Sequence, residues 1–367
     1  MKILLIGNSK IVFAKELKNE LVSLSIDVSL LDFEFLTMFD KNNEEFTAYS
    51  ERFKKYKNIP KLSMFFRMLY IKNIIKDNDF DIVNIHVSRW YYLFILQTIV
   101  KQKLVITFYG SDFYRTSKLV KNIQKIIYKK ADIVTFTNPS TKDSFLKYYN
   151  DFKNKLYVCR FGLKTLDYID ANRKISQRDI KKCLGYNQKK LIITCGYNST
   201  EAQQHEKIIQ AIVELPKQLL NNIQFIFPMT YGNITYKEKI KNILKMTSID
   251  YVLLEEFLYQ DDNAYVKLAS DIMINILQTD SFSGSMQEFL YAKNIVITAS
   301  WLPYDLFDKE GIVYYKIDED NELTKKLESV INNYEELKKN LNVNITIISK
   351  LSSWKNNIKS WVDIYEN

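Results

Sequence analysis

The chain has 367 residues, of which 52 are Lys or Arg and 43 are Asp or Glu, so its formal net charge is +9. This length exceeds the roughly 250–300 residues at which a single hydrophobic core stops growing, and it predicts two domains. Hydrophobic residues make up 47% and charged residues 26%, which is ordinary globular composition and excludes a disordered, collagen-like or low-complexity chain.

The first half alternates short apolar runs with amphipathic segments. Apolar residues at helical spacing in residues 12–24 follow a first strand and a turn. Strands that alternate with helices predict βαβ units and a parallel sheet. The expected strands are 2–7, 27–32, 81–86, 104–108 and 133–137, and the expected helices include 12–24, 62–75 and 118–130.

The second half repeats the pattern after a stretch, 165–187, that has little apolar content and is expected to be a connection. The expected elements are 191–195, 206–215, 223–227, 236–246, 251–254, 263–269, 272–277, 285–292 and 295–298. The sequence therefore predicts an α/β protein with one Rossmann-like domain at 1–168 and a second at 169–349. A C-terminal helix, 350–367, is expected to pack back on the first domain.

The segment 272–298 carries the strongest chemical signal. It reads as a strand, a small-residue loop and a helix, and Ser283, Gly284 and Ser285 lie where the helix begins. Free N–H groups at a helix N-terminus bind anions, and glycine lets a phosphate approach the backbone. Glu288 lies one turn further on, where a carboxylate can accept hydrogen bonds from ribose hydroxyls.

This segment, D-S-F-S-G-S-M-Q-E-F-L-Y-A-K-N-I-V-I-T, resembles the E-x7-E region of retaining GT-B glycosyltransferases, especially glycosyltransferase family 4. Asp280 replaces the first Glu of that pattern and Glu288 matches the second. The resemblance implies that Asp280 contacts the donor sugar, that Glu288 contacts the ribose, and that the amides between them contact the pyrophosphate. It also implies a GT-B fold, in which the two domains face each other across a cleft.

Weaker matches extend the resemblance over most of residues 1–300. They are the segments D-I-V-N-I-H (81–86), L-V-I-T-F-Y-G-S-D (104–112), A-D-I-V-T-F-T-N-P-S-T-K-D-S-F (131–145) and V-C-R-F-G-L (158–163). Two further segments, 196–205 and 227–232, resemble bacterial 4-acetamido-4,6-dideoxygalactose transferases.

The chain departs from the family pattern at two places. Tyr109 stands where the family has a histidine, and the Arg and Lys that neutralise the pyrophosphate are missing after Gly196. Other groups must then hold the donor phosphates. The candidates are the amides of Ser283, Gly284 and Ser285, together with Asn198, Ser199, His205 and Arg160.

His86 and Asp112 are the catalytic candidates of the first domain. His86 ends a buried strand and is either a cleft residue or a core histidine. Asp112 either orients acceptor hydroxyls or caps a helix. Gly7, Asn8 and Ser9 form the first strand–helix turn and, with Tyr109, are expected on the acceptor side; this turn lacks the G-x-G-x-x-G fingerprint of a dinucleotide site.

Residues 1–168 contain 28 Lys or Arg and 17 Asp or Glu, a balance of +11, whereas the remainder of the chain has a balance of −2. Helix 118–130 carries many of these lysines beside an apolar face. This helix is either an ordinary surface helix or a contact with an anionic membrane or a lipid-pyrophosphate acceptor.

The sequence predicts a glycosyltransferase that moves a sugar from a nucleotide sugar, expected to be UDP-linked, to a glycan or lipid-linked acceptor in bacterial surface polysaccharide or glycolipid synthesis. The expected reaction retains the anomeric configuration. The alternatives are a GT-B nucleotide-sugar epimerase and a non-enzymatic basic protein that binds membrane or nucleic acid. We expect no nucleic-acid partner, because no such motif is present.

Cysteine and histidine usage bears on cofactors and location. Three cysteines without a C-x-x-C pair and only two histidines predict no zinc site and no disulfide framework. The cysteine usage favours a reducing cytoplasm. The resemblance to GT-B enzymes implies that neither a catalytic metal nor a cofactor is needed. The basic first half favours peripheral attachment to the inner face of the plasma membrane. The longest apolar stretch, 90–100, is shorter than the roughly 20 residues that a bilayer-spanning helix needs.

Overall fold

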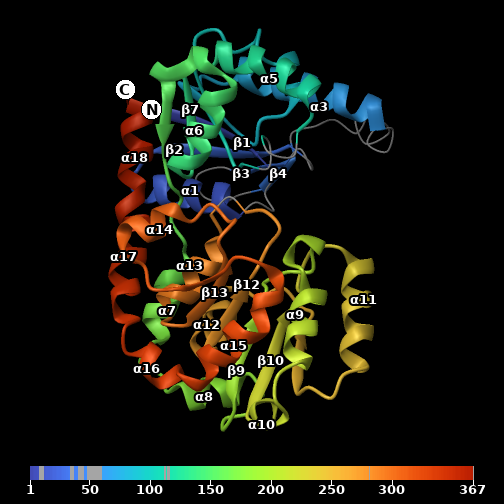
Figure 1. Ribbon diagram of the computed structural model, residues 1–367. Coiled ribbons are helices and arrows are strands. Elements are labelled where there is room, and N and C mark those ends of the chain that lie inside the picture. The colour runs from blue at the N-terminus through green and yellow to red at the C-terminus, as the bar shows by residue number, and fades with distance from the viewer. Residues whose placement is uncertain are drawn as a thin grey trace. The chain divides into compact units, whose positions relative to one another are not determined.

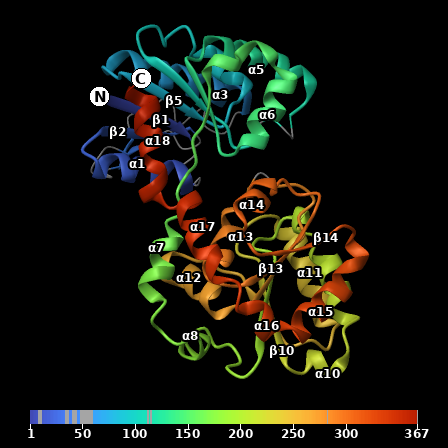
Figure 2. The same ribbon diagram turned by 60° about the vertical axis from the view of Figure 1, so that its left-hand side comes forward.

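The computed structural model describes residues 1–7, 12–33, 37–39, 45–47, 60–110, 113, 116–280 and 282–366. The chain divides into two compact units, each built on its own sheet (Figures 1 and 2). Unit 1 comprises Met1–Gly162 and Trp354–Asn367, and unit 2 comprises Leu163–Ser353.

Unit 1 contains an eight-stranded sheet with the order β4-β3-β2-β1-β5-β6-β7-β8. Neighbouring strands from β2 to β8 are parallel, and β3 and β4 extend the sheet as antiparallel strands. The strands are β1 (Lys2–Gly7), β2 (Asp27–Asp32), β3 (Thr37–Phe39), β4 (Glu45–Thr47), β5 (Ile82–His86), β6 (Lys103–Thr107), β7 (Ile133–Phe136) and β8 (Leu156–Val158).

Helices cover both faces of this sheet. Successive residues of a strand point to opposite sides, so an apolar strand gives the sheet two apolar faces to bury. In β1, Leu4 and Ile6 join the core under one helical layer, whereas Ile3 and Leu5 join the core under the other. The first layer consists of α3 (Pro60–Asp77), η1 (Trp90–Phe94), α5 (Lys118–Lys130), α6 (Pro139–Tyr148) and η2 (Asn150–Lys155). The second layer consists of α1 (Val12–Ser23) and α18 (Trp354–Glu366).

The C-terminal helix α18 completes unit 1. The Tyr365 hydroxyl accepts a hydrogen bond from Asn84 Nδ2 (2.7 Å), in the middle of the sheet, and the Ile364 carbonyl accepts one from Lys103 Nζ (2.6 Å). Trp361 is fully buried in the same core. The first 162 residues therefore do not form the whole of this unit.

Unit 2 contains a six-stranded, wholly parallel sheet with the order β11-β10-β9-β12-β13-β14. Its strands are β9 (Leu191–Cys195), β10 (Ile223–Pro228), β11 (Tyr251–Leu254), β12 (Ile272–Asn275), β13 (Ile295–Ala299) and β14 (Tyr315–Ile317). Its helices are α7 (Thr165–Asn172), α8 (Gln177–Cys183), η3 (Glu201–Gln203), α9 (His205–Val213), α10 (Lys217–Leu220), α11 (Ile234–Lys245), α12 (Gln260–Ala269), α13 (Gly284–Tyr291), α14 (Asp305–Glu310), η4 (Asp320–Glu322), α15 (Leu323–Asn332), α16 (Tyr334–Lys338) and α17 (Asn342–Ser352).

One sequence-based expectation about local structure is wrong. Residues 165–187 were expected to be a connection, but they form the helices α7 and α8. Leu166 and Ile169 of α7 are buried, and α7 packs against α12. Two apolar residues are too few to give a periodic signal, and the helix forms because tertiary packing stabilises it.

Candidate functional site

The carboxyl edge of the unit 2 sheet is the place where a ligand is expected. β9, the first strand of this sheet, lies between β10 and β12, so the strand order reverses beside it. Ligands of open parallel sheets bind at such a point, outside the carboxyl ends of the strands. The segments that follow β9, β10, β12 and β13 begin at this edge, and their described residues include 196–204, 229–233, 276–280, 282–283 and 300–304.

The N-terminus of α13 presents two backbone amides to this edge. Of the four N–H groups without an intrahelical partner, that of Ser283 donates to Asp280 Oδ2 (3.1 Å) and that of Met286 donates to Ser283 Oγ (3.2 Å). The amides of Gly284 and Ser285 have no acceptor within the part of the chain that the structure describes. Together with the positive end of the helix dipole, these two amides suit a phosphate.

Asp280 holds the loop that leads into α13. Its Oδ2 accepts hydrogen bonds from the Ser283 amide and from the hydroxyl of Tyr304, which follows β13. Burial, and then the neighbouring carboxylate, raise the pKa of the Tyr304 phenol well above its ordinary value, so that phenol remains a donor at neutral pH. Sequence reasoning did not find Tyr304, and the predicted contact of Asp280 with a sugar remains a prediction.

Glu288 forms a buried ion pair inside unit 2. Its Oε2 lies 3.2 Å from Nζ of Lys267 on α12, and the two side chains are only 11% and 6% exposed. Lys267 also donates a hydrogen bond to Asn263 Oδ1. Burial, and to a smaller extent the Glu288 charge, raise the pKa of the Tyr231 phenol. The ion pair engages Oε2, so a ribose contact would use Oε1.

Asn198 and Ser199 hold two loops of this edge together. Asn198 Oδ1 accepts hydrogen bonds from the amide (2.9 Å) and hydroxyl (2.8 Å) of Thr200. The amide and hydroxyl of Ser199 both donate to the Tyr231 carbonyl, at 2.7 and 2.9 Å. A Cβ on Gly232 (φ +130°) would lie 2.7 Å from the Ser199 carbonyl carbon, so this approach requires glycine. The predicted contacts of Asn198 and Ser199 with phosphate remain predictions.

His205 begins α9 and is fully buried. Burial lowers its pKa to about 4, so the ring is neutral at physiological pH. A Cβ on Gly196 would lie 2.8 Å from His205 Nε2, which places the ring directly against the end of β9. In this neutral state His205 cannot supply a positive charge for a pyrophosphate.

Tyr197 is a further residue of this edge whose role the sequence did not predict. Its amide donates a hydrogen bond to Gln203 Oε1 (3.3 Å). Burial, followed by the charge of Asp280, raises its pKa above the ordinary value for a phenol. The phenol of Tyr197 therefore feels the charge of Asp280, which precedes α13. The only sequence signal was its position, where the family carries a basic residue.

In unit 1, His86 lies at the end of β5 beside two other predicted residues. Its Nδ1 is 2.9 Å from the Tyr109 hydroxyl, and a Cβ on Gly7 would lie 3.3 Å from His86 Cβ. The ring stacks on Trp361 of α18, with centroids 6.5 Å apart. Burial lowers the pKa of His86 to about 3, so the imidazole is neutral. The structure thus brings His86, Tyr109 and Gly7 together.

Four predicted residues remain. Arg160 belongs to unit 1, where its carbonyl accepts a hydrogen bond from Trp361 Nε1 (2.8 Å), whereas the other predicted donor-binding residues belong to unit 2. Asn8, Ser9 and Asp112 lie outside the described residues.

The carboxyl edge of unit 2 offers backbone amides, phenols and carboxylates. This combination of hydrogen-bond donors and acceptors suits a ligand that carries phosphate and hydroxyl groups rather than a tightly held cation. No cluster of three or more His, Cys, Asp or Glu side chains with a metal-binding arrangement occurs among the residues with described positions.

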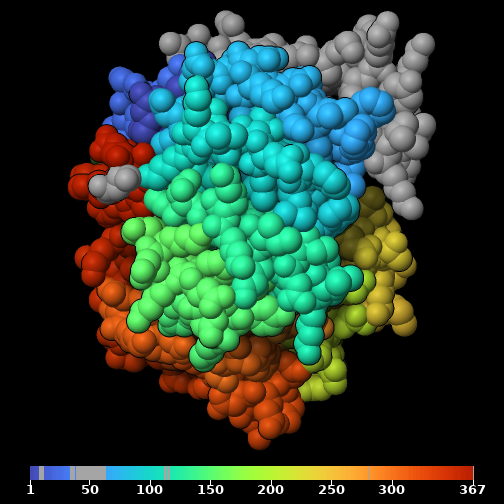
Figure 3. Space-filling view, turned by 90° about the horizontal axis from the view of Figure 1, so that it is seen from above, coloured from blue at the N-terminus to red at the C-terminus, as the bar shows by residue number. Residues whose placement is uncertain are grey.

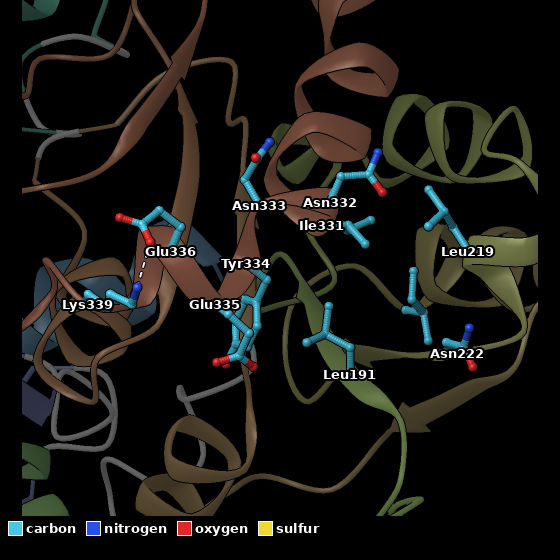
Figure 4. A pocket seen from close by; sticks show the side chains of 11 residues that line it. Leu191, Leu219, Asn222, Ile331, Asn332, Asn333, Tyr334, Glu335, Glu336 and Lys339 are labelled. Carbon is cyan, nitrogen blue, oxygen red and sulfur yellow. Dashed lines mark hydrogen bonds and ion pairs between the residues drawn. The ribbon is translucent and has the colours of Figure 1, made fainter.

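A cavity of about 480 Å³ lies at the opposite, amino-terminal edge of the same sheet (Figure 4). The starts of β9 and β10, at Leu191 and Ile223, line it together with residues 331–336. The hydroxyl of Tyr334 donates to Asp271 Oδ1 (2.6 Å) and is therefore engaged within the protein. Because the cavity lies at the amino ends of the strands, it is separate from the edge where α13 begins.

Comparisons with known proteins identify the architecture. Over its whole length the chain is similar to the Anabaena protein HepE, solved in complex with UDP, with 13% identity, a TM-score of 0.74 and full coverage of both chains. It is also similar to sucrose-phosphate synthase from Thermosynechococcus elongatus, with 10% identity, a TM-score of 0.78 and coverage of 100% and 98% of the two chains. A glycosyltransferase from Rickettsia africae shows 16% identity and a TM-score of 0.74, with coverage of 100% and 98%.

The fold is that of the GT-B glycosyltransferases. This confirms the predicted α/β class with two Rossmann-like domains. Residues 2–138 of the chain match the family model described as "Glycosyl transferase 4-like". No curated protein sequence matches the chain.

Whether the chain could span a membrane depends on the length and the apolar character of its helices. Among the helices that the structure describes, none is both long and apolar enough to cross a bilayer.

Proposed function

We propose that this protein is a glycosyltransferase that moves a sugar from a nucleotide-sugar donor to a glycan or lipid-linked acceptor. The GT-B fold and the family match of residues 2–138 support this assignment. Structures of the similar protein HepE contain UDP, UDP with glucose, and UDP-glucose. By analogy, we propose a UDP-linked hexose or a related sugar as the donor.

The observation that carries the proposal is the pair of amides at the start of α13, one helical turn before Glu288. In the proposed complex the amides of Gly284 and Ser285 bind the pyrophosphate and Glu288 Oε1 accepts a ribose hydroxyl. Asp280 precedes the amides and contacts the donor sugar. This order along one segment matches the order of the groups along a nucleotide sugar.

We propose that neither a metal nor a cofactor takes part. The α13 amides supply hydrogen-bond donors and the helix dipole to the phosphates. Lys267 does not replace them, because its charge is paired with Glu288.

We further propose that transfer proceeds with retention, on one face of the sugar. The bond between the anomeric carbon and the leaving phosphate oxygen breaks, the acceptor oxygen bonds to that carbon on the same face, and the acceptor proton passes to the leaving phosphate. An inverting enzyme would need a separate base. His86, with a pKa of about 3, is far from the value near the working pH that a base needs. His86, Tyr109 and Gly7 are then acceptor-side residues of unit 1.

A role in bacterial surface polysaccharide or glycolipid synthesis is the setting we propose. Residues 196–205 and 227–232 resemble segments of 4-acetamido-4,6-dideoxygalactose transferases, so acetamido sugars belong among the donors to be tested.

A thermal-shift screen of nucleotide sugars, followed by product analysis, tests the proposal. A transferase should be stabilised by one class of nucleotide sugar, and mass spectrometry should show the sugar on an added acceptor. Isomerisation of the donor in the absence of acceptor would instead identify an epimerase. A lack of stabilisation by every nucleotide sugar and free nucleoside diphosphate would contradict the proposal.

A further inference from the structure

The outward side of α5 carries apolar residues that the core does not use. The helix buries Gln124, Ile127 and Tyr128 against unit 1. Leu119 and Ile126 lie on the opposite side and are 72% and 54% exposed. A surface helix normally turns its aliphatic side chains to the core, so this outward pair has no explanation in the folding of unit 1.

Neighbouring elements continue the apolar surface. η1 packs beside both α5 and α3, and all three cover the same face of the sheet, so their outer sides share one layer. Figure 3 shows α3 in light blue, residues 90–101 in cyan and α5 in blue-green next to one another. The docking face is defined by the exposed apolar residues of α3, of residues 90–101 and of α5, which are Phe65, Leu69, Trp90, Phe94, Val100, Leu119 and Ile126.

Positive charge borders the α5 part of the docking face. Residues 82–131 contain nine Lys or Arg and a single acidic residue, Asp112. Lys118, Lys129 and Lys130 are exposed beside Leu119 and Ile126, and none of the three forms an ion pair within the described residues. Exposed apolar side chains next to three exposed lysines match the chemistry of an anionic lipid surface.

Two other lysines of α5 do not belong to this group of three. Lys121 Nζ lies 4.1 Å from the centroid of the Phe113 ring, and Lys125 forms an ion pair with Asp151 (3.1 Å). These lysines contact Phe113 and Asp151, so replacing them would remove contacts within unit 1 as well as charge.

We propose that the docking face binds the surface of an anionic bilayer, with its apolar residues in the interfacial layer and the three lysines on the lipid headgroups. A second copy of this chain fits the face poorly, because a symmetric contact would bring two sets of positively charged lysines together. Attachment is peripheral and reversible, since the contact rests on a few side chains and on screened charges. Vesicle binding needs no substrate, so the inference stands or falls separately from the proposed transferase activity.

Vesicle co-sedimentation of the full chain tests whether the three lysines contribute to membrane binding. Wild type should bind vesicles of phosphatidylcholine and phosphatidylglycerol at low salt, bind pure phosphatidylcholine weakly, and dissociate from the anionic vesicles at high salt. The variant Lys118→Glu/Lys129→Glu/Lys130→Glu should bind anionic vesicles at least tenfold more weakly. The control Lys182→Glu/Lys217→Glu/Lys245→Glu changes the net charge equally with exposed lysines of unit 2, and should bind like wild type.

A second pair of variants tests the apolar contact. Leu119→Ser/Ile126→Ser should weaken vesicle binding severalfold, whereas Ile234→Ser/Met246→Ser, at unit 2 positions that are 75% and 89% exposed, should not. UDP-sugar affinity should be equal in all four variants. The proposal is overturned if wild type ignores anionic vesicles at low salt, or if both lysine triples bind alike. It is also overturned if wild type forms a dimer that Leu119→Ser/Ile126→Ser abolishes.

Discussion

Lys267 Nζ lies 3.2 Å from Glu288 Oε2, and both side chains are almost completely buried. The carboxylate that we assign to the ribose is therefore also half of an internal ion pair. Removing one member of such a pair leaves an uncompensated charge in the interior and costs about 3–5 kcal/mol. A substitution of Glu288 consequently changes both binding and stability, and an experiment has to separate the two.

Glu288→Gln should lower nucleotide affinity at least tenfold, because a hydrogen bond to a charged group contributes roughly 1.5–3 kcal/mol. The same variant should also lower the free energy of unfolding, since Lys267 loses its partner. In Lys267→Met/Glu288→Gln the buried charge is gone, so stability should recover while nucleotide affinity stays low. Calorimetric titration with UDP and chemical denaturation measure the two quantities. Nucleotide binding like wild type in the double variant would remove Glu288 from the ribose site.

Asp280→Asn should depress turnover while free nucleoside diphosphate still binds. The asparagine carbonyl can accept the hydrogen bonds from the Ser283 amide and the Tyr304 hydroxyl, so the loop before α13 keeps its geometry. Tyr304→Phe, which removes one of these hydrogen bonds and no charge, is the control and should affect turnover less. Steady-state kinetics and UDP titration check both variants. An equal loss of UDP affinity in Asp280→Asn would place this side chain on the nucleotide instead.

Acid should destabilise both units before most carboxylates titrate. Burial holds the pKa of His86 at about 3 and that of His205 at about 4, whereas an unfolded histidine has a pKa near 6.5. Between pH 6.5 and 5 the unfolded state therefore binds protons that the folded state does not. The free energy of unfolding should fall by about 1.4 kcal/mol per pH unit for each histidine.

The quantity to measure for this prediction is the slope of the free energy of unfolding against pH, rather than its absolute value. His86→Asn should flatten the pH dependence of unit 1, and His205→Asn should flatten that of unit 2. Hydrogen exchange at several pH values reports each unit separately. Equal slopes in wild type and both variants would show that neither histidine is neutral in the folded protein.

Trp361→Ala should destabilise unit 1 by about 3–5 kcal/mol, because it empties a fully buried site in the core. It also removes the hydrogen bond from Nε1 to the Arg160 carbonyl (2.8 Å). Lys359→Ala on the same helix should cost less than about 0.5 kcal/mol, since Lys359 forms an exposed ion pair with Asp363. Hydrogen exchange should accelerate in β5 and β6 of the Trp361 variant and remain unchanged in unit 2. Equal acceleration in both units would contradict this assignment of α18.

The sequence predicted the strands of both sheets well, because buried parallel strands are short apolar runs bounded by turns. The predicted bounds of β1, β2, β9 and β11 and of helix α5 agree with the structure. The antiparallel strands β3 and β4 and the short strands β8 and β14 were not predicted. Three residues carry too little periodicity to be read from a single sequence.

The site was less accessible to sequence reasoning. The predicted segment 280–288 lies at the carboxyl edge of the unit 2 sheet, as a strand–loop–helix pattern requires. The partners of its carboxylates were not predicted, because Lys267 reaches Glu288 only through the packing of α12 beside α13. Tyr304 likewise reaches Asp280 from the segment after β13. Contacts of this kind follow from tertiary structure and leave no local pattern in the chain.

The return of α18 to unit 1 has a consequence for biosynthesis. The ribosome delivers Trp361 only after it has made all of unit 2, which takes roughly 10–40 s at ordinary rates of synthesis. Throughout that time the apolar surfaces of Phe161 and His86 that Trp361 covers in the finished protein lack their partner. Unit 2 can mature first, although it is encoded second, and the nascent unit 1 is the part of the chain that most needs protection from aggregation.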